Sequence, residues 1–318
     1  EGTRRTAPVQ LTPLGFGDHA HGLESGPLVG LYRFQEQRCV PPRSEKPPSS
    51  ATEAPPMPLH RPDWTNPPDE PDASGPPVQI WRLRLGNLDS DPEETLRPLT
   101  VPSEHRRADR YEFDADRHRH LAGRALVRLG LSRHYGRTPR DFSITDGPHG
   151  KPHLQESPDG APTLRFNIAH TDDVVVAAFS RTHPVGIDVE SLKREADVEA
   201  LAERIFTDAE RQRWRTLPDD QRQDTFFHLW TCKEAFLKAT GQGFQRAPCT
   251  IECRFDGGPV VAFDDADGYT LRSSDSPAAR WAVRSFVASE GIFGALVREH
   301  ELPSPLVWTD ASHFLGPR

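Results

Sequence analysis

Residues 185–190 read VGIDVE, a hydrophobic run that ends in two carboxylates, Asp188 and Glu190, spaced one residue apart. The run is typical of a β-strand, along which successive side chains point to opposite faces. Asp188 and Glu190 are therefore predicted to lie on one face of the strand, with Ile187 and Val189 on the other. Both carboxylates then point the same way.

A third carboxylate follows within residues 219–240, a segment predicted to be a helix. Steps of three and four residues along this helix place Trp230, Glu234 and Lys238 on one face, together with Phe227. Two acids at the end of a strand and a third on a helix form a hard oxygen site. Such a site suits Mg²⁺ and leaves coordination positions for substrate oxygens.

The spacing alone leaves a second interpretation open. An Asp-x-Glu sequence occurs often by chance, so Asp188 and Glu190 can also be read as ordinary surface charges. Glu234 and Lys238 stand four residues apart and can be read as a surface helix pair, which contributes roughly 0.2–0.5 kcal/mol. The neighbouring motifs decide between the two interpretations.

Hydrophobic periodicity predicts an α+β chain outside these two segments. Gly136 and Gly241 mark predicted helix ends, and Thr207 with Glu210 forms a predicted capping box. The run 174–179 and the run 185–190 are predicted to pair as a β-hairpin. The predicted helices cover residues 102–113, 114–135, 192–217, with a second piece that begins at Thr207, and 219–240. Residues 142–154 are predicted to form a strand, a turn and a second strand, and further strands are predicted over residues 78–85, 164–173, 174–180, 185–190, 249–255, 259–263, 269–274, 280–288 and 291–299.

Composition separates two tails from this ordered part. Of the 32 prolines in the chain, 16 lie in residues 1–77, which show almost no helical or strand periodicity. Such a stretch cannot bury enough apolar surface to offset its ordering entropy, so residues 1–77 are predicted to be a disordered, Pro-rich tail. Residues 303–318 are expected to form a loose tail. Between the tails, the order of the elements suggests two α+β halves.

Charge and hydropathy restrict the class of protein. The formal net charge of −8 argues against a general nucleic-acid binder, although bases gather in residues 104–137, where they suit a small polyphosphate. No run approaches the ~18 apolar residues of a membrane-spanning helix and no signal peptide opens the chain, so a cytoplasmic protein is expected. The four cysteines are too few for a disulfide framework or a four-ligand zinc site, and reduced thiols are expected.

Four motifs occur along the chain in a fixed order: HGKPHL (149–154), FNIAHT (166–171), VGIDVE (185–190) and FFHLWTCKEAFLKATGQGF (226–244). Together they closely resemble the motifs of the 4'-phosphopantetheinyl transferases of the large, monomeric, surfactin-synthetase-activating type. The resemblance covers roughly residues 106–299, and residues 1–77 lie outside it.

The resemblance implies a pseudo-dimeric α+β fold of two similar subdomains, each with a small sheet and a long helix, here residues 78–184 and 185–302. It also implies a reaction in which the serine hydroxyl of an apo carrier protein attacks the β-phosphate of coenzyme A, so that phosphopantetheine is transferred and 3',5'-ADP leaves. Mg²⁺, with Mn²⁺ as an alternative, is the implied cofactor. The implied partners are coenzyme A and apo acyl, peptidyl or aryl carriers of fatty-acid, polyketide or nonribosomal-peptide synthases, not nucleic acid or membrane.

Matching positions carry the family's site residues over to this chain. The resemblance implies that Asp188, Glu190 and Glu234 hold the metal ion, and that Glu234 also takes the serine proton. Lys238 is implied to neutralise phosphate charge. The residues implied to bind coenzyme A are Arg119, at its 3'-phosphate, and Lys151, His170 and Lys233, with Arg106 and Arg107 in a region of further basic residues.

Two positions depart from the family's pattern. His120 stands where many relatives have a small hydroxyl residue, and Thr171-Asp172 replaces the Ser-Gly that often follows the strand histidine. An acid beside a phosphate site is repulsive unless it points away. The placement of this turn is therefore open.

The acidic chain needs a local patch to dock an acidic carrier protein. We predict this patch in residues 192–217, where the apolar Ile205, Phe206 and Trp214 accompany a set of bases. These bases are Lys193, Arg194, Arg204, Arg211, Arg213 and Arg215.

Two other functional classes can be weighed against a transferase. A metal-dependent nuclease would need a broad basic groove, which the net charge of −8 disfavours. A non-catalytic module that binds coenzyme A or carrier proteins would keep the basic residues and tolerate loss of the acids. The presence of Asp188, Glu190 and Glu234 therefore favours catalysis.

Overall fold

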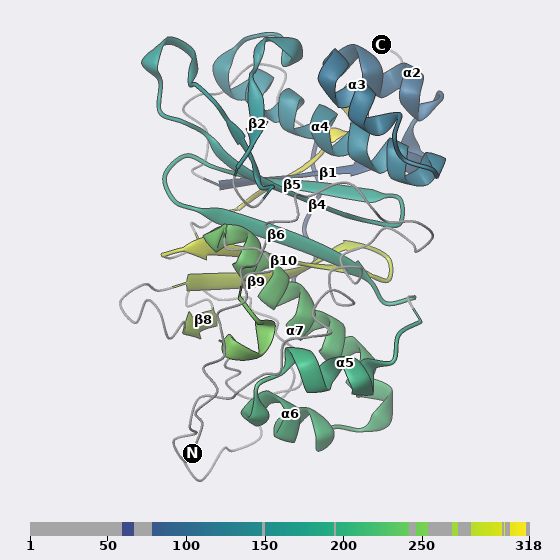
Figure 1. Cartoon of the computed structure of the whole chain (residues 1–318), viewed down its shortest axis with the longest axis vertical. Coiled ribbons are helices and arrows are strands. Elements are labelled where there is room, and N and C mark those ends of the chain that lie inside the picture. The colour runs from purple at the N-terminus through teal and green to yellow at the C-terminus, as the bar shows by residue number, and fades with distance from the viewer. Residues whose placement is uncertain are drawn as a thin grey trace, which may run out of the picture.

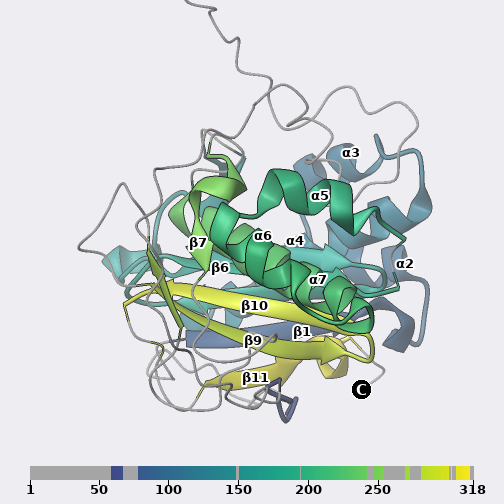
Figure 2. The ribbon, with the colours of Figure 1, turned by 90° about the horizontal axis from the view of Figure 1, so that it is seen from below.

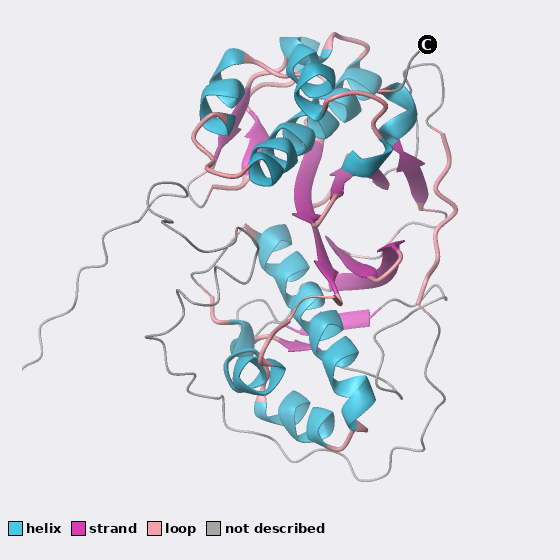
Figure 3. Ribbon diagram, turned by 90° about the vertical axis from the view of Figure 1, so that its right-hand side faces the viewer, coloured by secondary structure: helices cyan, strands magenta, loops and turns pink. Residues whose placement is uncertain are grey.

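The computed structural model describes residues 59–66, 78–147, 150–193, 195–241, 246–253, 269–272, 281–300, 302 and 306–315. Its elements form four layers, in the order helices, sheet, sheet, helices (Figure 1). The two sheets lie face to face in the centre, and each half contributes one sheet and one long helix (Figure 3). The predicted α+β fold with two similar halves is confirmed.

The N-terminal half is built on a four-stranded sheet with the order β11-β1-β5-β4. The helix α4 (Asp114–Tyr135) covers one face of this sheet. The other strands and helices of this half are β1 (Val78–Arg84), β4 (Arg165–Thr171), β5 (Val174–Ser180), β11 (Val307–Asp310), α2 (Pro92–Leu96), α3 (Pro102–Ala108) and the separate two-stranded ladder of β2 (Ile144–Asp146) and β3 (Pro152–Leu154), with 3₁₀ turns at Leu85–Asn87, Arg97–Leu99, Pro139–Asp141, Pro158–Gly160 and Ala311–Phe314.

The C-terminal half is built on a five-stranded sheet with the order β6-β10-β9-β8-β7. The helix α7 (Asp219–Thr240) crosses the outer face of this sheet over β6 and β10 (Figure 2). The other elements are β6 (Val185–Ser191), β7 (Glu252–Cys253), β8 (Tyr269–Arg272), β9 (Trp281–Ser289), β10 (Ile292–Glu299), α5 (Val198–Ile205), α6 (Asp208–Arg215) and a 3₁₀ turn at Pro248–Thr250.

Side chains on alternate positions of β6 face different layers of the fold. Val185, Ile187 and Val189 of β6 join the central core between the two sheets. The alternate residues of the same strand, Asp188 and Glu190, consequently face α7, as the hydrogen bonds of both carboxylates to that helix show. The predicted division of the VGIDVE run into an apolar face and an acidic face is confirmed.

The glycine of the same motif permits close contact between β6 and α7. A Cβ atom on Gly186 would lie 2.0 Å from the carbonyl oxygen of Ala235 and 2.4 Å from the amide nitrogen of Ala239. Any side chain would therefore push the helix away from the strand. The distance between the acids on β6 and the residues of α7 thus depends on Gly186.

The predicted helix ends are confirmed. Gly136 and Gly241 follow α4 and α7 with φ angles of 68° and 71°, the left-handed conformation that glycine adopts without strain. At α6, the side chain of Thr207 accepts a hydrogen bond from the amide of Glu210, and the Glu210 carboxylate accepts one from the amide of Thr207. The second helical piece predicted to begin at Thr207 is confirmed, because α5 ends at Ile205 and α6 begins at Asp208.

The β-hairpin predicted from the runs 174–179 and 185–190 is wrong. β5 and β6 belong to different sheets, and β5 pairs with β4 through the two-residue turn Asp172-Asp173. Both β5 and β6 are buried along their whole length. An apolar run of this kind indicates a strand between two layers, but it does not identify the neighbouring strand, which explains the error.

Both tails contribute ordered structure, in contrast to the expected disorder and looseness. β11, within the expected loose tail, pairs in parallel with β1 and completes the N-terminal sheet. Residues 59–66, within the expected disordered tail, run between the halves, with His60 bridged to Phe286 of β9 and Thr65 bridged to Thr309 of β11. The remainder of residues 1–77 lies outside the described residues. Short segments that form structure only against an existing sheet edge lack a periodic signal of their own.

None of the described helices combines the length and the apolar character that crossing a membrane requires. Cys232 and Cys253 are buried free thiols, as expected. Cys249 is disulfide-bonded, which the expectation of reduced thiols did not include.

Candidate active site

Asp188, Glu190 and Glu234, the acid trio, lie between β6 and α7 with exposures of 0%, 0% and 3%. The indole Nε1 of Trp230 donates a hydrogen bond to Oε1 of Glu190 over 3.0 Å, and the ammonium of Lys238 donates one to Oδ1 of Asp188 over 2.6 Å. Trp230, Glu234 and Lys238 are the residues predicted to share one helix face. The structure therefore brings the predicted acids and Lys238 together.

Burial and mutual repulsion perturb the ionisation of the acid trio. Burial, followed by the charge of Asp188, raises the pKa of Glu234 to about 8. Burial also raises the pKa of Asp188, although Lys238 opposes the shift. Burial alone would lower the pKa of Lys238, but the charges of Asp188 and Glu234 outweigh it and raise that pKa. One positive charge therefore does not fully compensate the acid trio.

The acid trio fits a divalent cation by its donor chemistry. Within the described part of the chain, Oδ2 of Asp188 and Oε1 of Glu234 are buried and accept no hydrogen bond, and carboxylate oxygens are the donors that Mg²⁺ prefers. Burying such oxygens without a partner is costly. Among the described residues, no three His, Cys, Asp or Glu side chains are already arranged as a metal centre. The unsatisfied oxygens are the observation that indicates a cation here.

Five basic residues, the basic cluster, gather around the N-terminal part of α4. They are Arg107, Arg119, His120, Arg124 and His170. Burial, then Arg119 and Lys238, lower the pKa of His170 to about 4. Burial, then Arg124, Arg107 and His170, lower the pKa of His120 to about 3. Both imidazoles are therefore neutral at pH 7, and each can donate one hydrogen bond to an anion. Lys238, which contacts Asp188, lies close enough to His170 to connect the basic cluster with the acid trio.

Arg119 is held from two sides. Its Nη2 donates to Oδ1 of Asp116 over 2.5 Å, and its Nη1 donates to the carbonyl oxygen of Asp172 over 3.1 Å. The Nε atom is buried and has no hydrogen-bond partner. Asp172 has a φ of 48°, the conformation for which glycine is favoured, and its side chain is exposed. Asp172 therefore contacts Arg119 through its backbone, so the departure from Ser-Gly adds no direct carboxylate contact there.

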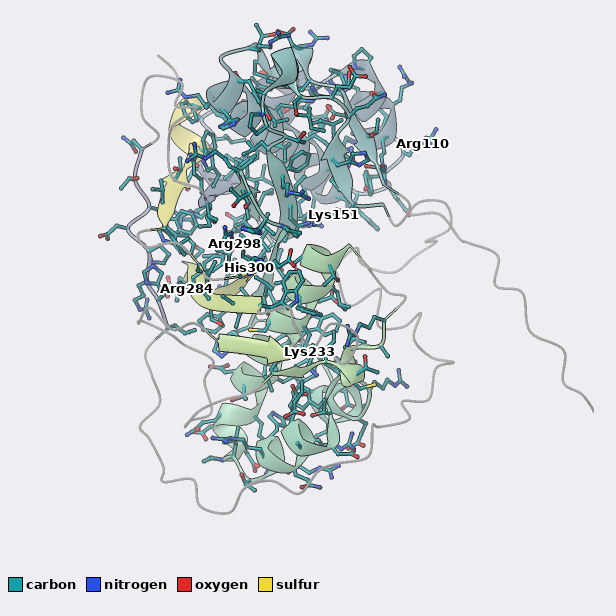
Figure 4. The ribbon with its side chains drawn as sticks, turned by 90° about the vertical axis from the view of Figure 1, so that its left-hand side faces the viewer. Arg110, Lys151, Lys233, Arg284, Arg298 and His300 are labelled. Carbon is teal, nitrogen blue, oxygen red and sulfur yellow. The ribbon has the colours of Figure 1, made fainter. Side chains whose placement is uncertain are left out.

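Lys151 binds backbone carbonyls at the junction of the two halves (Figure 4). Its ammonium donates to the carbonyl oxygens of Val185, Lys238 and Ala239 over 3.1, 2.6 and 3.4 Å. Two of these carbonyls belong to the last turn of α7, where a cation also stabilises the helix dipole. Burial, then Arg165 and Lys238, lower the pKa of Lys151 to about 8. Lys151 thus fastens the GKP turn to α7.

Lys233 does not take part in the site, so its predicted contact with coenzyme A needs correction. The side chain is fully buried, and its ammonium donates to Oε2 of Glu210 over 2.6 Å. Its other acceptors are the carbonyl oxygens of Ile205, Pro248 and Ile251. An ammonium has three N–H donors, which these acceptors already use. Lys233 therefore holds α5, α6 and the 248–251 turn onto α7.

Asn167 is a residue that the sequence analysis missed. Its side-chain oxygen accepts a hydrogen bond from the amide of Ile187 over 2.7 Å and ties β4 to β6. This bond joins the edge strands of the two sheets. The signal was present, because Asn167 lies in the FNIAHT motif beside His170, but a sequence alone does not show which backbone group an amide will meet.

The apolar residues of the carrier-docking patch predicted over 192–217 are not available at the surface. Ile205, Phe206 and Trp214 are buried in the core of the C-terminal half. Arg211 pairs with Asp208 and Glu203, so acidic neighbours reduce the positive charge of this surface. Amphipathic helices produced the error, because they place apolar and basic residues close together in sequence and on opposite faces in space.

Comparisons with known proteins match both halves of the chain. The family model described as 4'-phosphopantetheinyl transferase superfamily matches residues 184–288, and the model described as 4'-phosphopantetheinyl transferase, N-terminal, matches residues 93–182. The 4'-phosphopantetheinyl transferase HetI of Nostoc sp. is 37% identical over 169 residues, which are 53% of this chain and 70% of HetI. The 4'-phosphopantetheinyl transferase Sfp of Bacillus subtilis is 33% identical over 183 residues, which are 58% of this chain and 79% of Sfp.

A solved structure also aligns with the chain. The crystal structure of Thermotoga maritima holo-[acyl-carrier-protein] synthase has 23% sequence identity and covers 37% of this chain and 64% of that chain. Its TM-score is 0.27.

Proposed function

Since this chain belongs to the 4'-phosphopantetheinyl transferase superfamily and transfers phosphopantetheine to carrier proteins, we propose that the acid trio and the basic cluster form its active site. Coenzyme A is the donor, and the serine hydroxyl of an apo carrier protein is the acceptor. The new bond joins the serine oxygen to the β-phosphorus, and the bond from that phosphorus to the 3',5'-ADP leaving group breaks. The single observation that carries this proposal is the pair of buried, unsatisfied oxygens on Asp188 and Glu234.

Residues of α7 supply the groups nearest to the reacting phosphate in this proposal. Glu234 accepts the serine proton: its Oε1 makes no hydrogen bond to the described residues, and its pKa, raised to about 8, lies near the operating pH that suits a general base. Lys238 contributes positive charge beside Asp188, where charge develops on the pyrophosphate. Phosphoryl transfer depends mainly on positioning and charge compensation, which fits a site built from fixed charges.

Asp188, Glu190 and Glu234 are the residues that would hold Mg²⁺, or alternatively Mn²⁺. The bound ion supplies Lewis-acid stabilisation of phosphate oxygens. The hydrogen bond from Trp230 restricts the carboxylate of Glu190. Packing of Gly186 against the backbone of α7 sets the separation between the strand and the helix that carry the acids.

The basic cluster receives the 3'-phosphate end of coenzyme A in this proposal. The guanidinium of Arg119 is oriented by its hydrogen bonds to the carboxylate of Asp116 and to the backbone carbonyl of Asp172. Planar guanidinium groups suit phosphate. His170 and His120 are neutral donors beside Arg119. Lys238 lies close enough to His170 to lower its pKa, so one ligand with two phosphate positions can reach both the basic cluster and the acid trio.

The partners are proposed from the same chemistry. We expect carrier proteins or domains of fatty-acid, polyketide or nonribosomal-peptide synthases as acceptors, because all of them present a serine. We expect the enzyme to act as a monomer, since one chain supplies both the acid trio and the basic cluster. Light scattering coupled to size-exclusion chromatography would test the oligomeric state, and a stable dimer would contradict this expectation.

The test is intact-mass analysis of an apo carrier protein after incubation with the enzyme, coenzyme A and Mg²⁺. Wild-type enzyme should add one phosphopantetheine, and Glu234→Gln should lower the initial rate by roughly 10²–10⁴-fold, the range for loss of a general base. Glu290→Gln, an exposed glutamate of the β9–β10 turn, is the matched control and should retain the rate. Coenzyme A binding without transfer to several carrier types would favour the non-catalytic binding module.

A further inference from the structure

Asp146 places a carboxylate inside the basic cluster. Its Oδ2 accepts a hydrogen bond from Nη1 of Arg107 over 2.7 Å, and its Oδ1 accepts one from Nη2 of Arg124 over 3.0 Å. Each carboxylate oxygen thus binds a different guanidinium. A phosphate group binds two arginines through two of its oxygens in the same manner.

The neighbours of Asp146 are those of an anion site. His120, beside the same two arginines, has a buried Nε2 atom without a hydrogen-bond partner. Arg124, Arg107 and His170 all disfavour the protonated form of His120, whereas Asp146 favours it. Asp146 is therefore near enough to interact electrostatically with His120 as well as with the two guanidinium groups. Its carboxylate occupies the position that a ligand anion would take among them.

The location of Asp146 in the fold allows it to move. It is the last residue of β2, which, among the described strands, pairs only with β3 in a separate ladder of three residue pairs. Its side chain is 33% exposed. By contrast, Asp116, which orients Arg119, is buried within α4. The surroundings of Asp116 suit a fixed positioning residue, and those of Asp146 suit an exchangeable anion.

We propose that Asp146 is an internal competitor for the phosphate position of the basic cluster, so that it weakens binding of the 3'-phosphate of coenzyme A. The inference rests on the proposed function, because that function places the 3'-phosphate at this cluster. When the ligand binds, the phosphate displaces the carboxylate from Arg107 and Arg124, and the exposed side chain turns to solvent. In the absence of ligand, Asp146 compensates the charge of the two arginines.

The experiment compares Asp146→Asn with wild type by calorimetric titration of coenzyme A and of 3'-dephospho-coenzyme A. Asparagine keeps the shape of aspartate and removes its charge. We expect Asp146→Asn to lower the Kd for coenzyme A by about fivefold or more, the effect of one nearby like charge at a protein surface. The Kd for 3'-dephospho-coenzyme A should change less than about twofold, since that ligand lacks the competing phosphate.

Asp109→Asn is the matched control, because Asp109 pairs with Arg97 over 2.6 Å on the surface of the same half. This variant should leave both Kd values unchanged. Asp146→Ser is a second test variant, and thermal unfolding of each variant checks that the fold is retained.

Three outcomes would overturn the proposal. Unchanged affinity of Asp146→Asn for coenzyme A would make Asp146 an ordinary ion-pair residue, and weaker affinity would make it a positioning residue for the arginines. An equal decrease in the Kd of Asp146→Asn for both ligands would show a general effect of charge, without competition at the 3'-phosphate. Failure of wild-type enzyme to bind coenzyme A or modify a carrier would instead contradict the proposed function, so the two failures are distinguishable.

Discussion

Each half packs a 22-residue helix on a sheet, and each of these helices carries buried ionisable side chains. The two helices differ in how completely those side chains are hydrogen-bonded. On α4, Arg128 donates through Nε and Nη2 to both carboxylate oxygens of Glu104 and through Nη1 to the carbonyl oxygens of Pro139 and Phe142. On α7, Glu234 keeps one buried oxygen without a partner. The first arrangement is complete without a ligand, and the second is not.

The same contrast exists within α7. Lys233 and Glu234 are consecutive residues and both are buried, but Lys233 has four acceptors and Glu234 faces the acids of β6. A buried charge whose hydrogen bonds are complete stabilises the fold. A buried charge that lacks partners and repels its neighbours lowers stability and indicates a binding or catalytic role. Burial of a charge alone therefore does not distinguish structure from function, whereas completeness of its hydrogen bonds does.

The largest effect on stability is expected at Arg128. Arg128→Met would leave Glu104 buried without its partner, and breaking a buried ion pair in this way costs about 3–5 kcal/mol of unfolding free energy. Urea denaturation would measure the loss. The double variant Arg128→Met with Glu104→Leu should recover much of it, because no charge then stays buried alone. Equal losses in the single and double variants would show that the charges themselves are not responsible.

A smaller effect on the free energy of unfolding, and one of opposite sign, is expected from the replacement of His228. This α7 residue is 3% exposed, and both ring nitrogens lack hydrogen-bond partners. Replacing an unsatisfied buried polar group with an apolar one of similar size removes a desolvation cost, so His228→Leu should raise the free energy of unfolding by about 1 kcal/mol at pH 7. Urea denaturation would show it, and a loss of stability would indicate an unidentified bond to the ring.

His228 also makes stability depend on pH. Burial lowers the pKa of His228 to about 4 from its ordinary 6.5, so between these values the unfolded chain binds the proton and the folded chain does not. Stability from this residue is therefore present above pH 6.5 and is lost as the pH falls toward 4. The benefit of His228→Leu should grow on acidification, and a benefit that is constant from pH 7 to pH 4.5 would contradict this assignment.

The smallest effect is expected on the surface of α6. Arg211 and Arg213 were predicted to dock the carrier, but Arg211 already pairs with Asp208 and Glu203 and the nearby apolar residues are buried. Reversing both arginines to Glu should raise the KM for an acidic carrier less than about threefold, typical of exposed, screened charges. A tenfold rise in KM with unchanged coenzyme A affinity would restore the docking patch.

Much of the C-terminal site could be predicted from the sequence because its residues obey local rules. The period of a strand placed Asp188 and Glu190 on one face, and the period of a helix placed Glu234 and Lys238 together. Lys233 could not be separated from Glu234, because its acceptors come from residues far along the chain, such as Glu210 and Ile251. The partner of β5 was missed for the same reason, since strand pairing is a long-range property of two buried runs.

The most direct test of the contrast between the halves measures stability and transfer rate on the same preparations of Glu234→Gln and Arg128→Met. The predicted result is a crossed pattern. Glu234→Gln loses at least about a hundredfold in phosphopantetheine transfer with a midpoint of thermal unfolding that is unchanged or higher, because the variant removes a buried carboxyl whose ionised form is disfavoured by burial and by Asp188. Arg128→Met loses stability and, below its unfolding transition, retains the transfer rate. Parallel losses in both properties for both variants would contradict the account.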